Sequence, residues 1–230
     1  MLRVKELTIQ YPDGTRAIDE VSFAIEAGEN VALVGANGAG KTSLLLALVG
    51  VLQPSKGEIV VGETALGKKT LREIRSRIGM VFQNPDDQLF MPSIYEDVAF
   101  GPGNFGLSES ETEQCVTESL AQLGILHLSQ RSPLKLSAGE KRLAAIATVL
   151  AMKPEFLIFD EPTAFLDPRA RRGLTSVLSD LPQGKLIATH DLAFAETICR
   201  RIILLHKGKL LADGDWEILR NAEILEEAEL

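Results

Sequence analysis

The sequence contains few cysteines, few aromatic residues and no long apolar segment. Its two cysteines, Cys115 and Cys199, lack the spacing of metal ligands, which favours a reducing compartment. No run approaches the roughly 18 apolar residues that a membrane-spanning helix requires. Lysine and arginine number 24 against 32 aspartates and glutamates, and the net charge of −8 argues against a broad nucleic-acid surface, which depends on basic side chains.

The remaining composition is that of a globular protein. With 230 residues, 45% of them hydrophobic and 24% charged, the chain can bury one good core with room for a small subdomain. The first residues enter a strand-like pattern directly, without an apolar leader. We therefore expect a soluble protein of the cytosol.

The order of apolar patterns predicts a mixed α/β fold. Alternating apolar residues over Val21–Ile25, together with Leu2–Ile9 and a turn at 12–14, indicate an antiparallel β segment. Later apolar strands do not alternate and are separated by helical periodicities, which is typical of a parallel sheet covered on both faces. These later strands are predicted over Ile78–Phe82, Phe156–Phe159 and Leu186–Thr189.

Two segments depart from that pattern. Residues 84 to about 136 are rich in Pro, Gly, Asp, Glu and Ser and predict an inserted, mostly helical subdomain, with one amphipathic helix near Val116 and Leu120. Near the end of the chain, Ile202–Leu205 and Lys209–Ala212 predict a hairpin.

A glycine-rich segment, Gly35–Thr42, stands between an apolar strand over Val31–Val34 and an apolar helix. Glycines there can adopt positive φ and bring backbone N–H groups around an anion at the positive end of the helix. Lys41 would reach the β- and γ-phosphates, and Thr42 would offer a hydroxyl to Mg²⁺. An ordinary glycine-rich turn is the alternative, but the full motif in this setting predicts a nucleoside triphosphate site. Its predicted contacts are Gly35, Asn37, Gly38, Ala39, Gly40, Lys41, Thr42 and Ser43.

The strand over Phe156–Phe159 ends in two carboxylates, Asp160 and Glu161. They should lie at the carboxyl end of the sheet, the edge where the glycine-rich segment also lies. We expect Asp160 to hold Mg²⁺ through its water shell and Glu161 to orient and deprotonate the water that attacks ATP. A strand that ends in a solvated turn is the alternative interpretation.

A third motif, Leu-Ser-Ala-Gly-Glu-Lys-Arg at 136–142, precedes a long amphipathic helix. Alone, Ser137 and Glu140 form the pattern of a capping box. With the other two motifs, the segment resembles the signature sequence of ATP-binding cassette (ABC) ATPases, Leu-Ser-Gly-Gly-Gln, with Ala138 and Glu140 as departures. The resemblance implies that the Ser137 hydroxyl and the Gly139 N–H face a γ-phosphate.

The resemblance to ABC ATPases extends over nearly the whole chain. It implies that Gln83 reaches the metal from a glutamine loop and that His190 contacts the γ-phosphate and steadies Glu161. It also implies that Asp167 lies in a segment that crosses a dimer interface, where Phe165 replaces a small residue, and that Tyr11 stacks on adenine. Taken singly, a histidine or tyrosine at a strand end is more often an ordinary structural residue.

The implied fold is a P-loop NTPase core with a mostly parallel sheet, an N-terminal antiparallel β subdomain and an inserted α-helical subdomain. We expect one ABC ATPase domain over residues 1–230. Its nucleotide-binding core would occupy 1–83 and 138–230, and its helical subdomain 84–137.

The family resemblance also implies partners. Lys41 and Ser137 belong to different halves of one ATP site, which requires a homodimer or a heterodimer with a second ABC ATPase. The segments 82–90 and 96–102 resemble ATPase subunits of energy-coupling factor (ECF) importers. Asp86 and Asp87 would then line a groove for an integral membrane coupling subunit, in a complex with a substrate-binding membrane subunit. A solvated acidic loop is the alternative for these two residues.

The expected function is ATP hydrolysis that drives transport, with ATP and Mg²⁺ bound, at the cytoplasmic face of the cell membrane. Segments 136–142 and 185–192 look most like the cobalt or nickel importers. Because the ATPase does not touch the cargo, biotin or another vitamin stays open. A soluble ABC ATPase acting on ribosomes or DNA would usually carry two cassettes or a basic surface. A small-molecule kinase would lack the signature segment.

Overall fold

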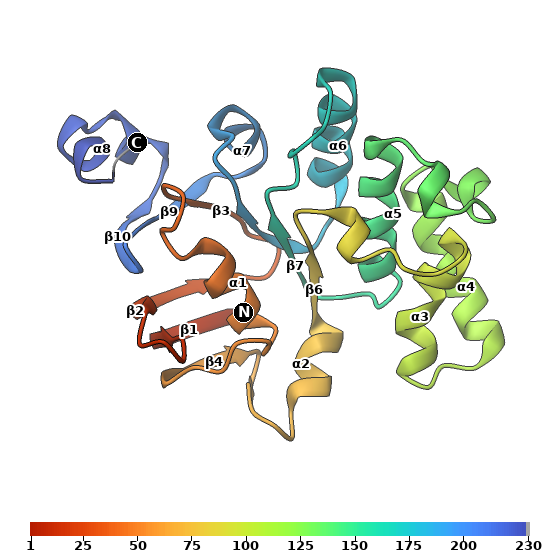
Figure 1. Cartoon of the computed structure of the whole chain (residues 1–230), viewed down its shortest axis with the longest axis horizontal. Coiled ribbons are helices and arrows are strands. Elements are labelled where there is room, and N and C mark those ends of the chain that lie inside the picture. Colours follow the sequence, from red (N-terminus) through yellow and green to blue (C-terminus); the bar gives the residue numbers. More distant parts are fainter. Residues whose placement is uncertain (229–230) are drawn as a thin grey trace. The chain divides into compact units, whose positions relative to one another are not determined.

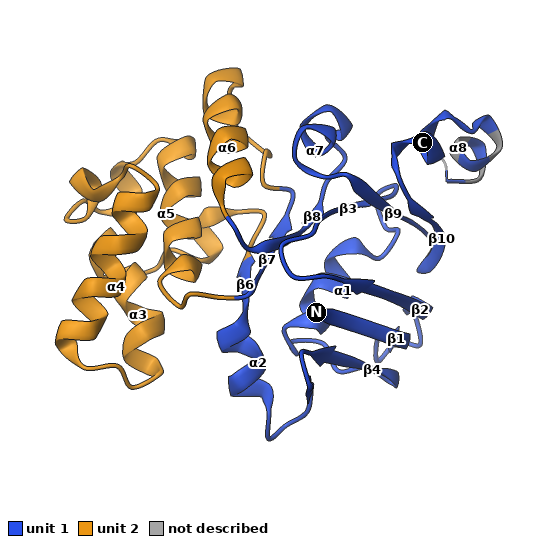
Figure 2. Ribbon diagram, turned by 180° about the vertical axis from the view of Figure 1, so that it is seen from behind, with its two compact units in different colours: residues 1–80, 155–161, 182–230 blue, residues 81–154, 162–181 orange. Residues whose placement is uncertain are grey.

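The computed structural model describes residues 1–228, and these form two compact units (Figure 2). Unit 1 comprises residues 1–80, 155–161 and those from 182 onward, and unit 2 comprises 81–154 and 162–181. The division differs from the predicted boundary at 84–137 because two later helices group with the inserted ones. The predicted single domain over 1–230 and its internal boundaries stay a prediction, and residues 229–230 lie outside the described residues.

The first sheet of unit 1 is antiparallel, with strand order β2-β1-β4-β5. Its strands are β1 (Leu2–Gln10), β2 (Arg16–Ile25), β4 (Lys56–Val61) and β5 (Thr64–Ala65). Leu2 pairs with Ile25 and Val4 with Phe23, and all four side chains are buried on one face. The alternation in the sequence therefore predicted β1 and β2 correctly, whereas β4 begins with Lys-Gly-Glu and gave no such signal.

The second sheet of unit 1 is mostly parallel, with strand order β10-β9-β3-β8-β7-β6 (Figure 1). Its members are β3 (Asn30–Val34), β6 (Ile78–Val81), β7 (Phe156–Asp160), β8 (Gly184–Ala188), β9 (Arg201–His206) and β10 (Lys209–Gly214). β3 pairs in parallel with β8 and β9, and β7 pairs in parallel with β8. Every residue of β7 and β8 is buried, which explains the apolar runs Phe156–Phe159 and Leu186–Ala188 within these strands.

Helices complete unit 1. α1 (Lys41–Leu48) follows the glycine-rich segment, and α2 (Leu71–Arg77) leads into β6. α7 (Leu192–Ile198) follows β8, and the 3-10 helix η4 (Trp216–Arg220) and α8 (Ala222–Ala228) follow the predicted hairpin of β9 and β10. Among residues 1–228, no helix combines the length and the apolarity needed to cross a membrane.

Unit 2 is helical (Figure 2). It contains α3 (Ile94–Asn104), α4 (Glu109–Gln122), α5 (Ala138–Leu150), α6 (Pro168–Asp180) and the short 3-10 helices η1 (Pro85–Asp87), η2 (Leu126–Leu128) and η3 (Pro133–Lys135). α5 packs against α3, α4 and α6, and α3 also packs against α4. Capping boxes at Ser108 and Ser137 begin α4 and α5.

Candidate nucleotide-binding site

The glycine-rich segment joins β3 to the N-terminus of α1 in unit 1. Gly38 and Gly40 have φ values of 82° and 104°, a conformation that favours glycine. A side chain at Gly40 would collide with the carbonyl oxygen of Ala17. No side chain caps α1, so the N–H groups of its first turn and its positive dipole end are left for an anion.

Lys41 places a cation in this loop. Its side chain is 8% exposed, and its Nζ donates hydrogen bonds to the carbonyl oxygens of Gly35 at 2.6 Å and Ala36 at 3.1 Å. Burial lowers the pKa of Lys41, and the carboxylates of Glu161 and Asp160 oppose that shift. The loop thus holds an ammonium group close to its own backbone.

Thr42 and Asp160 bring two oxygen ligands together. The Thr42 hydroxyl donates to Asp160 Oδ2 at 2.8 Å, although 118 residues separate the two in sequence. Asp160 is 5% exposed, and burial raises the pKa of its carboxyl group. A hydroxyl beside a carboxylate suits Mg²⁺, because this ion prefers oxygen ligands. Water molecules and phosphates supply the rest of its coordination shell. Accordingly, Mg²⁺ fits here even though no group of three His, Cys, Asp or Glu ligands occurs within residues 1–228.

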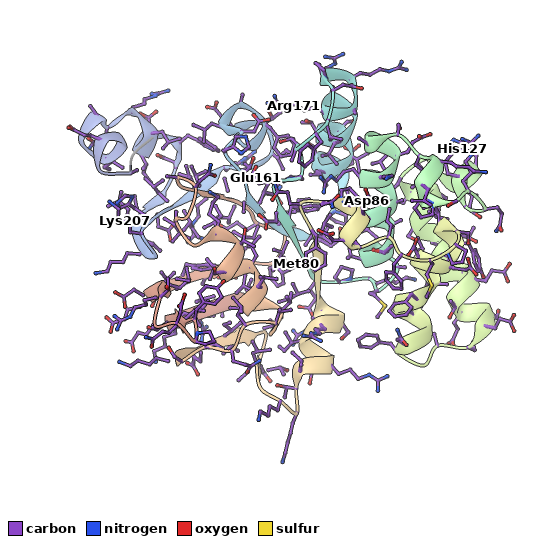
Figure 3. The ribbon with its side chains drawn as sticks, in the orientation of Figure 1. Met80, Asp86, His127, Glu161, Arg171 and Lys207 are labelled. Atoms are coloured by element: carbon purple, nitrogen blue, oxygen red, sulfur yellow. The ribbon has the colours of Figure 1, made fainter. Side chains whose placement is uncertain are left out.

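Glu161 follows β7 in a left-handed backbone conformation, with φ 44° (Figure 3). Its N–H donates to the Ala188 carbonyl oxygen at 2.8 Å, and its carboxylate accepts from the Thr189 hydroxyl at 3.1 Å. The carboxylate also accepts from the His190 backbone N–H at 3.1 Å, and His190 Nδ1 lies 2.9 Å from Glu161 Oε2. The structure therefore brings Glu161 and His190 together, and it adds Thr189, which the motifs did not single out.

A hollow of about 370 Å³ opens beside the phosphate loop within unit 1. Tyr11 lines it, and the Tyr11 hydroxyl lies 3.0 Å from Ser43 Oγ. Arg16 and Ala17 at the start of β2 and Lys207 in the turn after β9 also line this hollow, and no motif in the sequence singled them out. Figure 3 marks Lys207 beyond the end of β9.

The predicted signature segment lies in unit 2, at the N-terminus of α5. Glu140 Oε2 accepts from the Ser137 N–H at 2.8 Å and from the Ser137 hydroxyl at 2.6 Å, and these bonds lower the pKa of Glu140. The capping box is thus formed, while Ser137 itself stays exposed. Ser137, Gly139 and Asp167 share the wall of a hollow of about 580 Å³.

Gln83 is also exposed in unit 2, and its backbone is held by Arg142 of α5. Arg142 is 1% exposed and donates to the carbonyl oxygens of Phe82 and Gln83, both at 2.6 Å. Burial lowers the pKa of Arg142 to about 10. Asp167 accepts from the backbone N–H groups of Arg169 and Ala170 at the start of α6, and these bonds lower its pKa.

One carboxylate of the acidic loop after Gln83 forms an ion pair within unit 2. Asp86 Oδ1 lies 2.6 Å from Lys141 Nζ, with Asp86 55% exposed (Figure 3). Beyond it, Phe90 and Phe100 are 62% and 45% exposed and form an edge-to-face pair with ring centroids 5.0 Å apart. Neither the ion pair nor the aromatic pair was predicted from the sequence.

Comparisons with known proteins agree with this geometry. A family profile described as ABC transporter matches residues 18–164. The energy-coupling factor transporter ATP-binding protein EcfA of Methanothermobacter thermautotrophicus is 44% identical, over 100% of this chain and 76% of that protein. Among solved structures, cbiO1 of Clostridium perfringens, part of the ABC transporter complex cbiONQ, is 37% identical with a TM-score of 0.86, over 98% of this chain and 92% of that one. A dimeric ATP-binding cassette bound to ADP and Pi is 26% identical with a TM-score of 0.82, over 94% and 98% of the two chains.

Proposed function

Since this chain belongs to the ABC transporter family and is one of its ATP-binding, ATP-hydrolysing subunits, we propose that it powers an importer of the energy-coupling factor type. Support comes from the similarity to EcfA and to cbiO1, which is part of a membrane transporter complex. It also comes from exposed residues of unit 2, Asp86 and the aromatic pair of Phe90 and Phe100, which offer charge and apolar area to a membrane subunit.

The observation that carries hydrolysis is the buried Glu161 carboxylate. It is 8% exposed and is fixed by Thr189 and by the His190 backbone. A carboxylate held in this way orients a water molecule and accepts its proton as the water attacks the γ-phosphate. His190, whose side chain is 74% exposed, would contact the γ-phosphate from its place beside Glu161.

The other groups of unit 1 hold the triphosphate. Lys41 would exchange its two loop carbonyls for β- and γ-phosphate oxygens, while the open N-terminus of α1 supplies backbone N–H donors. Tyr11 would carry the adenine in the hollow beside the loop. Thr42 and Asp160 would hold Mg²⁺. The metal contact implied for Gln83, which belongs to unit 2, stays a prediction. When bound, the metal neutralises charge on the β- and γ-phosphates.

A second ABC ATPase completes the site in this proposal. Ser137, Gly139 and Asp167 of one chain would meet the ATP held by Lys41 of the other. The exposure of Ser137 and Asp167 supports this, because groups that act on a ligand of another chain must be accessible. The dimeric state of the related cassette supports it as well.

The proposed cargo rests on sequence resemblance alone. The resemblance of segments 136–142 and 185–192 to cobalt and nickel importers favours a transition metal ion, and a vitamin such as biotin is the second candidate. In either case the chain would sit at the cytoplasmic face of the membrane. Asp86 and Asp87 would face the coupling subunit, and a substrate-binding membrane subunit would belong to the same complex.

Substitution of Glu161 tests the shared site. Glu161→Gln keeps the shape but removes the base, so ATP hydrolysis should fall by about 10²–10⁴-fold while ATP binding persists. Sedimentation velocity with Mg-ATP should then show an accumulated dimer. Glu58→Gln, an exposed residue of β4, serves as the control and should hydrolyse ATP normally. A Glu161→Gln chain that stays monomeric at high concentration with bound ATP would contradict a site shared by two copies of this chain.

Affinity purification from membranes tests the transporter assignment. The tagged chain should recover an integral membrane protein, and Asp86→Lys combined with Asp87→Lys should reduce the recovery. Recovery of ribosomes or DNA in place of a membrane protein would contradict the assignment to an importer.

A further inference from the structure

A carboxylate stands in the predicted signature segment, at the position where the family sequence has a glutamine. This residue, Glu140, lies in the first turn of α5 and is half-buried in the wall of the hollow that Ser137 and Gly139 also line. In the proposed shared ATP site, the Ser137 hydroxyl donates a hydrogen bond to a γ-phosphate. Glu140 therefore brings a negative charge to the place where another negative group is expected.

In the structure, the Ser137 hydroxyl is already engaged by Glu140. The hydroxyl donates to Glu140 Oε2 at 2.6 Å, and its oxygen accepts from the Glu140 backbone N–H at 3.4 Å. The same carboxylate oxygen accepts from the Ser137 N–H at 2.8 Å. Because these bonds from Ser137 hold the pKa of Glu140 below its ordinary value, the carboxylate is ionised at neutral pH.

One hydroxyl cannot serve both acceptors. A serine carries a single hydroxyl proton, and the oxygens of a phosphate are strong acceptors. A hydrogen bond to an ionised acceptor is roughly twice as strong as a bond between neutral groups, so Glu140 holds the proton of Ser137 more firmly than a glutamine would. The carboxylate also repels a phosphate that approaches the same hydroxyl.

We propose that Glu140 is a positioning residue that competes with the γ-phosphate for the Ser137 hydroxyl and thereby weakens the ATP-bound dimer. The inference rests on the proposed shared ATP site, formed by two copies of this chain. When ATP is bound, the hydroxyl turns to the phosphate, while Glu140 keeps the Ser137 backbone N–H as a partner. Once hydrolysis has removed the γ-phosphate, Glu140 recaptures the hydroxyl, which favours separation of the two chains.

Unit 2 contains a second capping box with the same geometry. The Ser108 hydroxyl donates to Glu111 Oε2 at 2.7 Å, and the Ser108 N–H donates to the same oxygen at 2.8 Å. These bonds lower the pKa of Glu111 as well. This box begins α4, whose sequence has no signature motif. Glu111→Gln therefore removes the same charge and the same kind of bond and serves as the matched control.

The first measurement is dimerisation with Mg-ATP. In the full chain carrying Glu161→Gln, the further change Glu140→Gln should tighten the dimer by about tenfold in sedimentation velocity, because a two-fold dimer carries the change at both of its sites. Glu111→Gln should leave the dimer unchanged. A fluorescent ATP analogue at low protein concentration should bind both variants equally, because Lys41 and its loop belong to unit 1.

Thermal melts without nucleotide separate competition from a structural role. Glutamine still accepts a hydrogen bond at the cap, so Glu140→Gln and Glu111→Gln should each lower the melting temperature by no more than about 2–4 °C. Glu140→Gln would then be no more stable than the parent as a monomer, yet would form the tighter dimer. A role in folding alone predicts a loss in both measurements.

Ser137→Ala shows whether Glu140 acts through the serine. In the Glu161→Gln chain that also carries Ser137→Ala, the further change Glu140→Gln should tighten the dimer by only about twofold to threefold, because no hydroxyl remains for which the carboxylate can compete. A gain of equal size with and without the hydroxyl would overturn the inference.

The other outcomes are distinct. If Glu161→Gln dimerises and the addition of Glu140→Gln leaves the dimer equal or weaker, the inference is wrong while the shared site stands. If Glu111→Gln tightens the dimer as much as Glu140→Gln does, net charge explains the effect and the inference is overturned. If Glu161→Gln never dimerises, the site shared by two copies fails, and the inference fails with it.

Discussion

The two units hold their predicted nucleotide contacts in opposite ways. In unit 1, Lys41, Asp160 and Glu161 are at most 8% exposed, and each has hydrogen-bond partners inside the unit. In unit 2, Gln83, Ser137 and Asp167 are exposed, and they are held by caps and backbone bonds at the start of helices or loops. Unit 1 thus buries the groups that are proposed to bind ATP, while unit 2 exposes the groups that are proposed to meet the ATP of another chain.

The buried charges explain this difference. A charged group out of water is tolerated only where partners or ligands compensate it, and unit 1 gathers a lysine and two carboxylates around one loop. An exposed serine at a helix N-terminus has no such cost and needs no partner to stay folded. The following experiments test the contrast, beginning with the largest expected effect.

Removal of the buried cation of unit 1 should weaken the binding of ATP. Lys41→Ala should weaken ATP binding by about a hundredfold, because charge-assisted bonds to two phosphates are lost. Isothermal titration calorimetry measures the change. Lys56→Ala, an exposed lysine of β4, should bind ATP like the parent. Unchanged affinity in Lys41→Ala would remove the phosphate-binding role from the loop.

Arg142 tests whether unit 2 orders its own glutamine loop. Arg142→Met keeps the volume but leaves the carbonyls of Phe82 and Gln83 without their donor. A loss of roughly 2 kcal/mol should lower the melting temperature by about 4–8 °C. Hydrogen exchange over residues 82–88 should accelerate, since Gln88 and Arg142 tie that loop to α5.

Two comparisons sharpen the Arg142 experiment. Arg172→Met, an exposed arginine of α6, should change neither the melting temperature nor the exchange. Arg142→Lys should fall between parent and Arg142→Met, because an ammonium cannot span both carbonyls as a guanidinium does. Normal exchange in Arg142→Met would show that the loop is ordered by other contacts.

Ser137 and Ser108 form a matched pair in unit 2. Both begin helices through the same capping box, so Ser137→Ala and Ser108→Ala should each lower the melting temperature by about 2–4 °C, the effect of roughly 1 kcal/mol. Only Ser137→Ala should also slow ATP hydrolysis, by about tenfold, because only that hydroxyl would face a phosphate. Equal rates of ATP hydrolysis in the two variants would show that Ser137 only caps its helix and does not contact a phosphate.

The smallest expected effect concerns the buried carboxyl group of unit 1. Burial raises the pKa of Asp160 above its ordinary 3.8, so its ionised form destabilises the nucleotide-free fold at neutral pH. Asp160→Asn should raise the melting temperature at pH 7 by about 2–4 °C. The gain should shrink as pH falls through the raised pKa of Asp160 and vanish below 3.8, where the group is protonated in both folded and unfolded chains.

A control for the pH experiment is Asp180→Asn, an exposed aspartate at the end of α6. It should give no such stabilisation at either pH. A gain in Asp160→Asn that is independent of pH would attribute the effect to packing instead of charge.

Several elements followed from local sequence. The alternation of Val21, Phe23 and Ile25 predicted β2, and the unbroken apolar runs predicted β7 and β8. Helix α3 was not recognised as a helix, because Gly101, Pro102 and Gly103 obscure its pattern. It forms nonetheless, since Ser93 caps it and its buried Ile94 and Val98 pack against neighbouring helices of unit 2.

The sequence by itself determined which chemical groups are available, because a glycine loop with Lys41 and a carboxylate pair after an apolar strand have few other uses. Only the tertiary structure decided how those groups are held. It placed Thr189 on Glu161, Arg142 on the loop backbone and Lys141 on Asp86, at sequence separations from 28 to 60 residues. The physical reason is that hydrogen bonds and burial depend on proximity in the folded chain, which strand order and helix packing set and which local periodicity does not record.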